Sequence, residues 1–377
     1  MKLVIVGGGA SGLMLASILK NKNANLDIEI IEKLDHVGKK ILVTGNGRCN
    51  LSNINIKLNC YNNEFGYDVA NSFDVVSYFN ELGLLTINDD EGRVYPMSLT
   101  ANSVLDVLRE SISDVKVLEN TNVSKISKNN NQYTIITDNF DFINADIVVL
   151  ATGGKTYYKD CNSYNLTSML SNRVTPLRPT LTSVRVEENL ASIENLKSKV
   201  KASLLFKNQV IYEDYGEVLY KKNALSGIVM FQLSSIMARD PYKTYHIELD
   251  LIPSMSEDEL TTYIENHPNM TGLFAKMINQ YIIKNSSSKN PKDLAHTIKH
   301  LRFNALENLD YKNAQITAGG VSLDEISENL ESKYNKNLYF IGEMLDVDGI
   351  CGGYNLHFAF ASANKVAKDI LDKVGTK

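Results

Sequence analysis

A glycine-rich turn near the start of the chain has the spacing of a dinucleotide-binding site. Gly7, Gly9 and Gly12 follow an apolar run, Lys2–Val6. A helical pattern, Ala10–Lys20, begins within the turn. In such a turn the first glycine permits a tight bend, the second lets the backbone approach a pyrophosphate, and the third lets helix and strand pack closely. Amide groups at the N-terminus of the helix would then bind the phosphates.

Glu32 extends this pattern, because it stands at the end of a second apolar run, Asp27–Glu32. A carboxylate at this distance from the glycines accepts hydrogen bonds from the adenosine ribose, and it favours a free 2′-hydroxyl over a 2′-phosphate. The alternative is a glycine-rich turn that holds no ligand. The strand, the glycines, the helix, the second strand and the acidic residue together favour the dinucleotide site.

Three further segments favour a flavin dinucleotide over a nicotinamide dinucleotide. Thr44–Asn50 is a second glycine-rich loop, and its Arg48 could neutralise a pyrophosphate or hold the loop against a flavin. Val148–Gly154 reads as a strand that runs into a turn of small residues, and Leu338–Glu343 as a strand followed by the glycine-opened helix at Gly352–Asn355. Reduction of a flavin places negative charge on its ring, which amides at a helix N-terminus stabilise. We therefore expect FAD.

Three residues in these segments are candidates for catalysis. Cys49 and Cys351 could form a redox-active pair, but no closely spaced cysteines accompany them, so buried inert thiols are the favoured interpretation. His357 could donate a proton near the flavin, although a packed histidine at the start of the last helix is favoured. The sequence assigns no catalytic residue beyond these candidates, and flavin chemistry does not require one because the cofactor carries the hydride.

Two other groups of residues could bind ligands. His296 and His300 have the spacing of a zinc pair on a helix, but they lack the adjacent glutamate of HExxH and have lysines nearby. We interpret them as a solvated helix face and expect no metal. Tyr157, Tyr158 and Tyr164 could line a substrate site, and ordinary packing explains them equally well.

The order of the elements predicts a cofactor domain built from both ends of the chain. Residues 1–180 with 317–377 alternate strands and helices, including one helix near Val69–Leu82. Residues 181–254 with 302–316 read as β-rich, with separate strands at Val210–Tyr212 and Glu217–Tyr220, and residues 255–301 read as helical. The expected fold class is α/β, a Rossmann-like FAD-binding domain with an inserted β-barrel-like domain and a small helical domain. Because the glycine-rich turns lie outside the insert, we expect the insert to form the wall of the substrate cavity.

The composition excludes several classes of protein. The 377 residues carry a net charge of −5, which does not favour binding to nucleic acid or to an anionic membrane. The four cysteines are scattered, as expected of a cytoplasmic protein rather than a disulfide framework. No long apolar run without glycines is present, so we expect no membrane span. The oligomeric state stays open.

Long stretches of the chain resemble a bacterial flavoprotein family that includes aminoacetone oxidases and BaiN-type bile-acid reductases. The family belongs to the two-dinucleotide-binding-domain flavoproteins. The matching stretches are GGGASGLMLA, GKKILVTGNGRCNLSN, EGRVYPMSLTANSVLDVL, VVLATGGKTYY, GEVLYKKNALSGIVMFQLS, ITAGGVSLDEI and LYFIGEMLDVDGICGGYNLHFAFASA. The resemblance implies FAD contacts from Gly7, Gly9, Ala10, Ser11, Gly12, Glu32, Lys33, Lys40, Gly45, Gly47, Arg48, Cys49, Asn50, Thr152, Gly153, Gly342, Glu343, Gly353, Tyr354 and Asn355.

The sequence also departs from that family in three places. The stretch Tyr157–Asn165 is bulky and lacks the small-residue loop usual there, Cys351 replaces a threonine, and His357 replaces a glutamine. The resemblance implies an FAD-dependent oxidoreductase for a small or medium organic substrate, acting as an oxidase or as a reductase with NAD(P)H as a transient electron donor. A flavoprotein that acts on nucleic acid, of the tRNA-modification type, and a non-catalytic flavoprotein scaffold are the alternatives.

Overall fold

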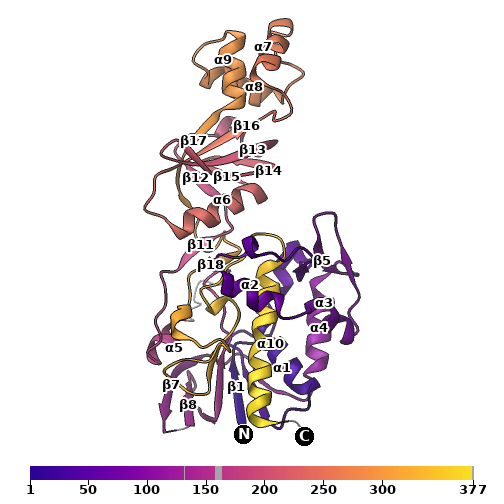
Figure 1. The fold of residues 1–377 in the computed structure, drawn as a ribbon, viewed down its shortest axis with the longest axis vertical. Coiled ribbons are helices and arrows are strands. Elements are labelled where there is room, and N and C mark those ends of the chain that lie inside the picture. Colours follow the sequence, from indigo (N-terminus) through magenta and orange to yellow (C-terminus); the bar gives the residue numbers. More distant parts are fainter. Residues whose placement is uncertain (131, 158–163, 376–377) are drawn as a thin grey trace. The chain divides into compact units, whose positions relative to one another are not determined.

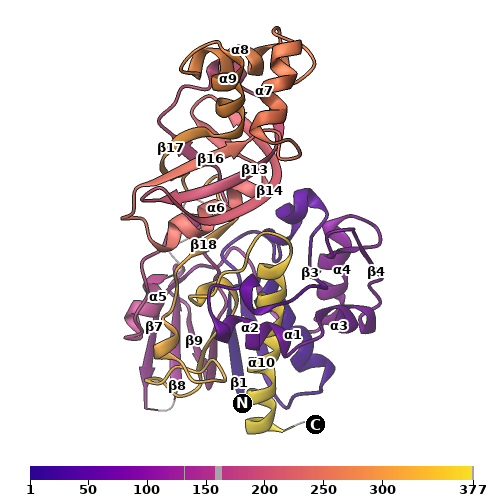
Figure 2. The same cartoon turned by 45° about the horizontal axis from the view of Figure 1, so that its top comes forward.

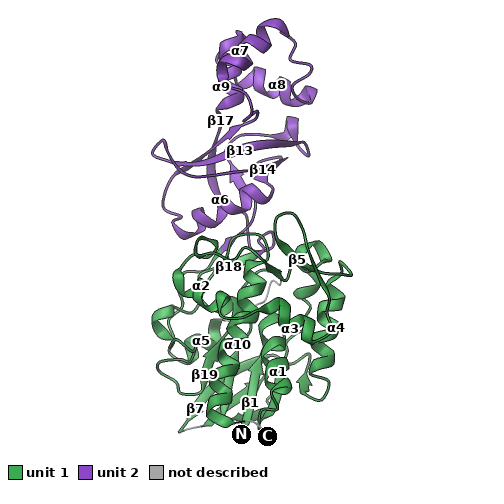
Figure 3. Ribbon diagram, turned by 45° about the vertical axis from the view of Figure 1, so that its right-hand side comes forward, with its two compact units in different colours: residues 1–178, 316–377 green, residues 179–315 purple. Residues whose placement is uncertain are grey.

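The computed structural model describes residues 1–130, 132–157 and 164–375. The chain divides into two compact units, which Figure 3 shows in different colours. Unit 1 comprises Met1–Arg178 with Ile316–Lys377, and unit 2 comprises Pro179–Gln315. Both ends of the chain therefore build the first unit, and the second unit is an insertion in it. None of the described helices is both long and apolar enough to cross a membrane.

A parallel sheet of five strands forms the centre of unit 1, in the order β19-β10-β1-β2-β6. The strands are β1 (Lys2–Val6), β2 (Asp27–Ile31), β6 (Lys116–Leu118), β10 (Ile147–Leu150) and β19 (Leu338–Phe340). Except in the edge strand β6, their side chains are almost all buried, because a parallel sheet is covered on both faces and its inner strands read as continuous apolar runs. The Rossmann-like prediction is confirmed.

Helices cover this sheet, and a second small sheet packs beside it. Helix α1 (Ala10–Asn21) contacts both α4 (Ala101–Ser111) and α10 (Tyr354–Val374), and α1 and α10 lie side by side in Figures 1 and 2. The antiparallel strands β7 (Val123–Asn129), β8 (Gln132–Thr137) and β9 (Phe142–Ala145) contact β1 and β10. This arrangement buries the central strands from both sides.

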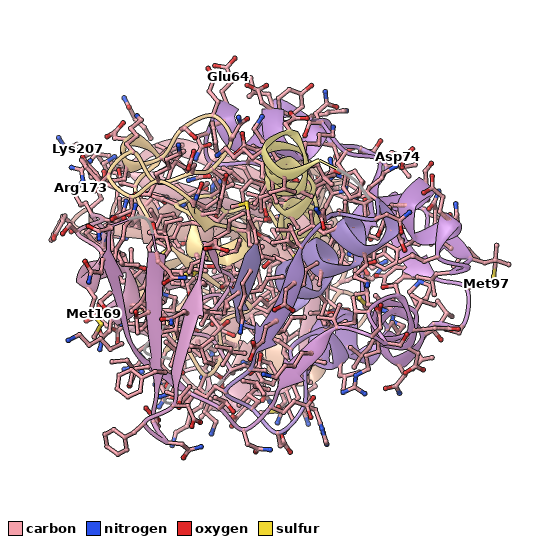
Figure 4. All side chains as sticks on the ribbon, turned by 90° about the horizontal axis from the view of Figure 1, so that it is seen from below. Glu64, Asp74, Met97, Met169, Arg173 and Lys207 are labelled. Carbon is pink, nitrogen blue, oxygen red and sulfur yellow. The ribbon has the colours of Figure 1, made fainter. Side chains whose placement is uncertain are left out.

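The region around residue 70 differs from the single helix expected there. The structure has two helices, α2 (Glu64–Asn71) and α3 (Val75–Glu81), so that prediction is wrong. The carboxylate of Asp74, labelled in Figure 4, accepts a hydrogen bond of 2.9 Å from the amide of Ser77 and so starts α3. Unit 1 also contains α5 (Tyr164–Met169), β3 (Ser52–Asn53), β4 (Thr86–Asn88), β5 (Arg93–Pro96) and β18 (Ile316–Ala318), which pairs with β11 (Arg178–Thr180). Its short 3-10 helices include Ile41–Gly47 and Gly342–Met344.

Unit 2 contains a closed antiparallel barrel, as expected of a β-barrel-like insert. The strand order is β12-β15-β14-β13-β16-β17. The strands are β12 (Val184–Val186), β13 (Lys197–Phe206), β14 (Gln209–Lys221), β15 (Ala224–Ser226), β16 (Tyr245–Asp250) and β17 (Leu301–Asn308). Helix α6 (Ile228–Arg239) packs against β14 and β15. The prediction of two separate strands within β14 is wrong, because the polar residues between them pair with β13; Glu213, for example, lies 3.2 Å from the ammonium group of Lys201.

Three helices complete unit 2: α7 (Glu257–Asn266), α8 (Lys276–Asn285) and α9 (Pro291–Lys299). Leu260, Ile264 and Ile298 from these helices belong to the same hydrophobic core as the barrel strands. The helical segment and the barrel therefore form one compact unit rather than two.

Candidate cofactor-binding site

The expected cofactor residues gather along one edge of the parallel sheet. Strands β2, β1, β10 and β19 are successive neighbours and parallel, so their carboxyl ends meet at this edge. Glu32, Gly7, Thr152 and Gly342 follow these strands within two residues. The edge beyond the carboxyl ends of the strands, near the point where the strand order reverses, is where open α/β sheets bind their ligands.

The three glycines of the β1–α1 turn differ in what surrounds them. A Cβ on Gly7 would lie 2.4 Å from the carbonyl oxygen of Ala151, and one on Gly12 would lie 2.0 Å from that of Gly7. These two positions are closed to any side chain. A Cβ on Gly9 would have no described protein atom within 4 Å. The glycine there leaves open space, as a bound phosphate requires.

The N-terminus of α1 can bind an anion. Its cap residue Gly9 offers no side-chain cap, no acidic side chain lies in the first turn, and the first hydrogen bond within the helix runs from the amide of Leu13 to Gly9. The amides of Ala10 and Ser11 therefore lack partners inside the helix. Unpaired amides and the positive end of the helix dipole together favour a phosphate group.

Glu32 is tied to the same turn. Its carboxylate accepts hydrogen bonds from the amides of Gly8, at 2.7 Å, and Leu34, at 2.8 Å. Burial raises the pKa of Glu32, the amide hydrogen bonds from Leu34, Gly8 and Lys33 oppose this, and the nearby Glu119 carboxylate adds to it. An ionised carboxylate has about four acceptor positions, so with three amides bonded one remains for a ribose hydroxyl. The neighbouring Lys33 is exposed.

Lys40 and Glu343, from opposite ends of the chain, form an ion pair of 2.9 Å. The other carboxylate oxygen of Glu343 accepts a 2.7 Å hydrogen bond from the amide of Thr317, whose hydroxyl oxygen accepts one of 2.9 Å from the amide of Lys155. These contacts fix the turns after β10 and β19 against each other. The sequence indicates no role for Thr317, although this residue lies in the family stretch Ile316–Ile326.

The second glycine-rich loop is held in an unusual backbone conformation. Gly45, Gly47 and Cys49 have φ angles of 55°, 81° and 56°. Gly45 is required there, because its Cβ would lie 2.7 Å from the amide nitrogen of Asn50. The exposed guanidinium of Arg48 lies over the ring of Tyr95, 4.9 Å from its centre. Arg48 is thus held by a ring rather than by a carboxylate, which leaves its charge suited to an anion.

Asn50 and Gly353 meet where helix α10 begins. Gly353 has a φ of 101°, and its Cβ would lie 2.3 Å from the carbonyl oxygen of Ser52 and 2.7 Å from Oδ1 of Asn50. That Oδ1 is buried and has no hydrogen-bond partner among the described residues. A buried acceptor without a donor costs about 1–3 kcal/mol, so its persistence points to a donor on a ligand.

The side chains of Tyr354 and Asn355, which follow Gly353, bond to other parts of unit 1. Asn355 accepts a hydrogen bond from the amide of Gly349 at 2.8 Å and donates one to its carbonyl at 2.9 Å. Tyr354 is buried, and its hydroxyl donates to the carbonyl of Asn55. Neither side chain is directed to a ligand by these contacts. What this end of α10 offers is its backbone amides, because Gly353 caps it without a side chain and the first turn has no acidic residue.

These features together fit FAD. The amides of α1 suit the pyrophosphate, Glu32 suits the ribose, and the amides of α10 with the unpaired Oδ1 of Asn50 suit a polar ring system.

Of the two candidate cysteines, Cys49 is buried and Cys351 is half-buried. Burial raises the pKa of Cys49 to about 12 and that of Cys351 to about 11, so the reactive thiolate is disfavoured at both. Cys49 forms no disulfide with a described residue. These surroundings favour the inert interpretation over the redox-active pair. Cys161 lies outside the described residues.

His357 is a packed histidine in the structure. Its Nε2 donates to the carbonyl oxygen of Ala70 at 2.9 Å, so its Nδ1 is the acceptor for the hydroxyl of Ser52 at 2.8 Å. Burial lowers the pKa of His357 to about 4. The ring is neutral near pH 7 and both nitrogens are engaged within the protein, which favours packing over proton donation.

The structure describes two of the three tyrosines of the atypical loop, Tyr157 and Tyr164. Tyr164 is buried, and its hydroxyl donates a hydrogen bond of 3.0 Å to the carbonyl of Glu343. It thereby supports the turn that carries the Lys40 ion pair. Tyr157 is exposed, and Tyr158 lies outside the described residues with most of that loop.

Comparisons with known proteins identify the family. The model for the HI0933-like protein Rossmann domain matches residues 1–369. A 3-dehydro-bile acid delta(4,6)-reductase from Clostridium scindens is 32% identical over 96% of this chain and 97% of its own length. A ribosomal RNA dihydrouridine synthase from Haemophilus influenzae is 24% identical over 97% of this chain and 98% of its own length.

The solved structures agree on the fold. A 3-ketosteroid-delta4-(5alpha)-dehydrogenase from Rhodococcus jostii aligns with 98% of this chain and 96% of its own, at a TM-score of 0.50 and 12% identity. Together with the family match, the glycine-rich edge and the unpaired amides described above, these results show that the chain belongs to the HI0933-like family and is an FAD-dependent oxidoreductase.

Proposed function

We propose that the enzyme reduces a carbon–carbon double bond conjugated to a ketone in a steroid-like substrate, with NAD(P)H as electron donor. The observation that carries this proposal is the 32% identity to the 3-dehydro-bile acid delta(4,6)-reductase, which extends over nearly the full length of both chains. Overall, NAD(P)H gives one hydride and water gives one proton, the double bond becomes a single bond, and NAD(P)⁺ leaves. FAD, when bound, supplies the relay of the hydride.

The residues of unit 1 would prepare the site for this reaction. The amides at the N-terminus of α1 and the Glu32 carboxylate would hold the ADP half of the cofactor. The amides at the start of α10 would stabilise negative charge that develops on the ring system. The candidate thiols and His357 give no proton donor, so we assign the proton to solvent.

The direct test uses purified protein without oxygen. A 3-dehydro-bile acid with the delta(4,6) double bonds is mixed with NADH or NADPH, and the product is analysed by mass spectrometry. We expect a mass gain of two hydrogens and one NAD(P)H consumed for each product molecule. The saturated bile acid is the control and should consume none. Oxidation of a substrate with hydrogen peroxide formation in air, and no reduction of the dienone, would assign the enzyme as an oxidase instead.

A second candidate is reduction of uridine in ribosomal RNA. Its support is the similarity to dihydrouridine synthases from Haemophilus influenzae and Escherichia coli, at 24% and 23% identity over nearly the whole chain. The chemistry is related, because dihydrouridine also forms by reduction of a double bond conjugated to a carbonyl. The net charge of −5 gives no general attraction for a phosphate backbone. Dihydrouridine formed in unmodified ribosomal RNA, with no turnover of dienones, would favour this candidate.

A further inference from the structure

Helices α7 and α9 of unit 2 bring three metal-binding side chains together on the surface. Glu257 is the first residue of α7, His296 lies in the last turn of α9, and His300 directly follows α9. One carboxylate oxygen of Glu257 lies 3.3 Å from Nδ1 of His296 and 3.7 Å from Nε2 of His300. One ligand atom from each residue lies within 4.8 Å of the other two. Ligands of a tetrahedral zinc ion are roughly 3.3 Å apart, given metal–nitrogen bonds near 2.0–2.1 Å.

His300 is oriented for such a role by a carboxylate behind it. Its Nδ1 lies 3.1 Å from a carboxylate oxygen of Glu248 and donates to it, which leaves Nε2 directed to Glu257. Glu248 is itself held by the guanidinium of Arg302 at 2.8 Å. Histidines that bind metals commonly donate their other ring N–H to a carboxylate, which fixes the tautomer and the ring direction.

The two features that argue against a metal in the sequence have explanations in the structure. The acidic ligand missing from the helix of the two histidines is supplied by Glu257 of another helix. The Glu257 side chain does not take part in the capping box of α7, because Ser256 and Glu259 form that box. The nearby cation Lys299 is paired with Asp250 at 2.7 Å, so its charge is directed away from the histidines.

We propose that Glu257, His296 and His300 bind a divalent transition-metal ion, Zn²⁺ best of all. Two imidazoles and one carboxylate are a ligand set that suits zinc and neighbouring first-row ions, whereas Mg²⁺ and Ca²⁺ prefer oxygen ligands throughout. A water molecule would complete a tetrahedral site. The ion would link α7 directly to the end of α9, two elements that α8 separates along the chain. This proposal is independent of the flavin chemistry and replaces the expectation of no metal.

The test is a calorimetric titration of the full-length flavoprotein with Zn²⁺ after treatment with a chelator. We expect saturable binding of one ion per chain, with Mg²⁺ giving none. His296→Ala and His300→Ala should each weaken binding at least tenfold. Glu248→Ala, which removes the acceptor that orients His300 and no ligand, should weaken binding by about 10–100-fold. The matched control is His267→Ala, because His267 is an exposed histidine at the end of α7 that belongs to no such cluster among the residues that the structure describes.

A second measurement on the same proteins distinguishes the loss of the metal site from misfolding of a variant. Zn²⁺ should raise the melting temperature of the wild type and of the His267 variant, and it should leave that of the His300 variant unchanged. Circular dichroism establishes that each variant is folded before titration. The proposal is overturned if the wild type shows no one-to-one binding, or if His267→Ala weakens binding as much as His300→Ala does.

Discussion

Glu32 links the backbone of the glycine-rich turn to the expected cofactor. Two of its acceptor positions are occupied by the amides of Gly8 and Leu34, so the carboxylate is held in place before any ligand binds. Binding then requires no further ordering of this side chain, which is the benefit of preorganisation. Glu32 should therefore contribute to the affinity only of ligands that contain adenosine.

Replacement of Glu32 by alanine should weaken FAD binding by about 1.5–3 kcal/mol, the range for hydrogen bonds to a charged group. The measurement is a fluorescence titration of the cofactor-free protein with FAD. FMN is the internal control, because it lacks adenosine and should bind wild type and variant equally weakly. Equal FAD affinity in the two proteins would mean that the ribose is held by other residues.

His357 is an ionisable residue used as a packing residue. Its two ring nitrogens bind Ser52 and Ala70, and its pKa lies near 4 instead of near 6.5 because the ring is buried. Between these two pH values the unfolded chain binds a proton that the folded chain does not. Acidification therefore favours unfolding through this one residue, and the loss amounts to about 3 kcal/mol over the whole interval.

His357→Gln should make the protein less sensitive to acid. The resembling family carries glutamine here, so the variant is expected to fold. The free energy of unfolding, measured by urea denaturation at pH 6.5 and pH 4.5, should fall by about 2 kcal/mol less in the variant than in the wild type. His267→Gln changes an exposed histidine and serves as the control. If both variants showed the pH dependence of the wild type, acid sensitivity would have to arise from carboxylates alone.

At the scale of elements, different glycines of the β1–α1 turn are required by the fold and by the cofactor. Gly12 is packed against the carbonyl of Gly7, whereas the space beside Gly9 contains no described protein atom. The φ angle of Gly9 is −81°, which any residue adopts. A methyl group at Gly12 thus collides with the protein itself, and one at Gly9 collides only with what binds there.

Gly9→Ala should leave the stability of the cofactor-free protein nearly unchanged and weaken FAD binding at least tenfold. Gly12→Ala should destabilise the cofactor-free protein by several kcal/mol. The new methyl group would overlap the backbone carbonyl of Gly7, which cannot move away as the end of a flexible side chain could. Thermal unfolding and FAD titration of both variants check the two effects separately. A Gly9 variant that binds FAD normally would place the pyrophosphate away from this turn.

The elements predictable from sequence were those whose determinants lie close together in the chain. The strand, turn and helix around Gly7 follow from local periodicity and glycine spacing. The helix expected at Val69–Leu82 was wrong, because apolar periodicity continues through Asp74 while the carboxylate of that residue starts a new helix. At such a position the apolar periodicity predicts one continuous helix, whereas the capping residue predicts a new helix start. The periodicity alone does not show which of the two forms.

The contacts that complete the two sites join residues far apart in the sequence. Lys40 pairs with Glu343, and His296 approaches Glu257 although the whole of α8 lies between them in the chain. Each residue type was visible in the sequence, and Lys40 and Glu343 were assigned to the site, but their partners were not. Only the folded topology brings such pairs together, since nothing local distinguishes these charged residues from solvated ones.

At the scale of the whole molecule, the two units differ in what they can bind. Unit 1 contains every glycine-rich turn assigned to the cofactor, and its amides at α1 and α10 are the anion-binding groups described above. Unit 2 is a closed barrel with α6 and three further helices, and no Gly-x-Gly turn occurs between residues 179 and 315. Cofactor binding should therefore depend on unit 1, and differences in substrate between relatives should depend on unit 2.

Exchange of Pro179–Gln315 for the corresponding segment of the Clostridium scindens reductase tests this division directly. Both connections fall at the boundary between compact units, so the cores of both units stay intact in the chimera. The FAD content per chain should equal that of the wild type, because no residue of the cofactor edge is changed. The ratio of kcat/KM values for a set of dienones should move toward that of the donor enzyme, because substrate choice is a difference in transition-state binding. The reciprocal chimera is the control and should shift in the opposite direction. A folded chimera that keeps FAD and also keeps its original preference would assign substrate choice to unit 1, and one that loses FAD would show that unit 2 supports the cofactor.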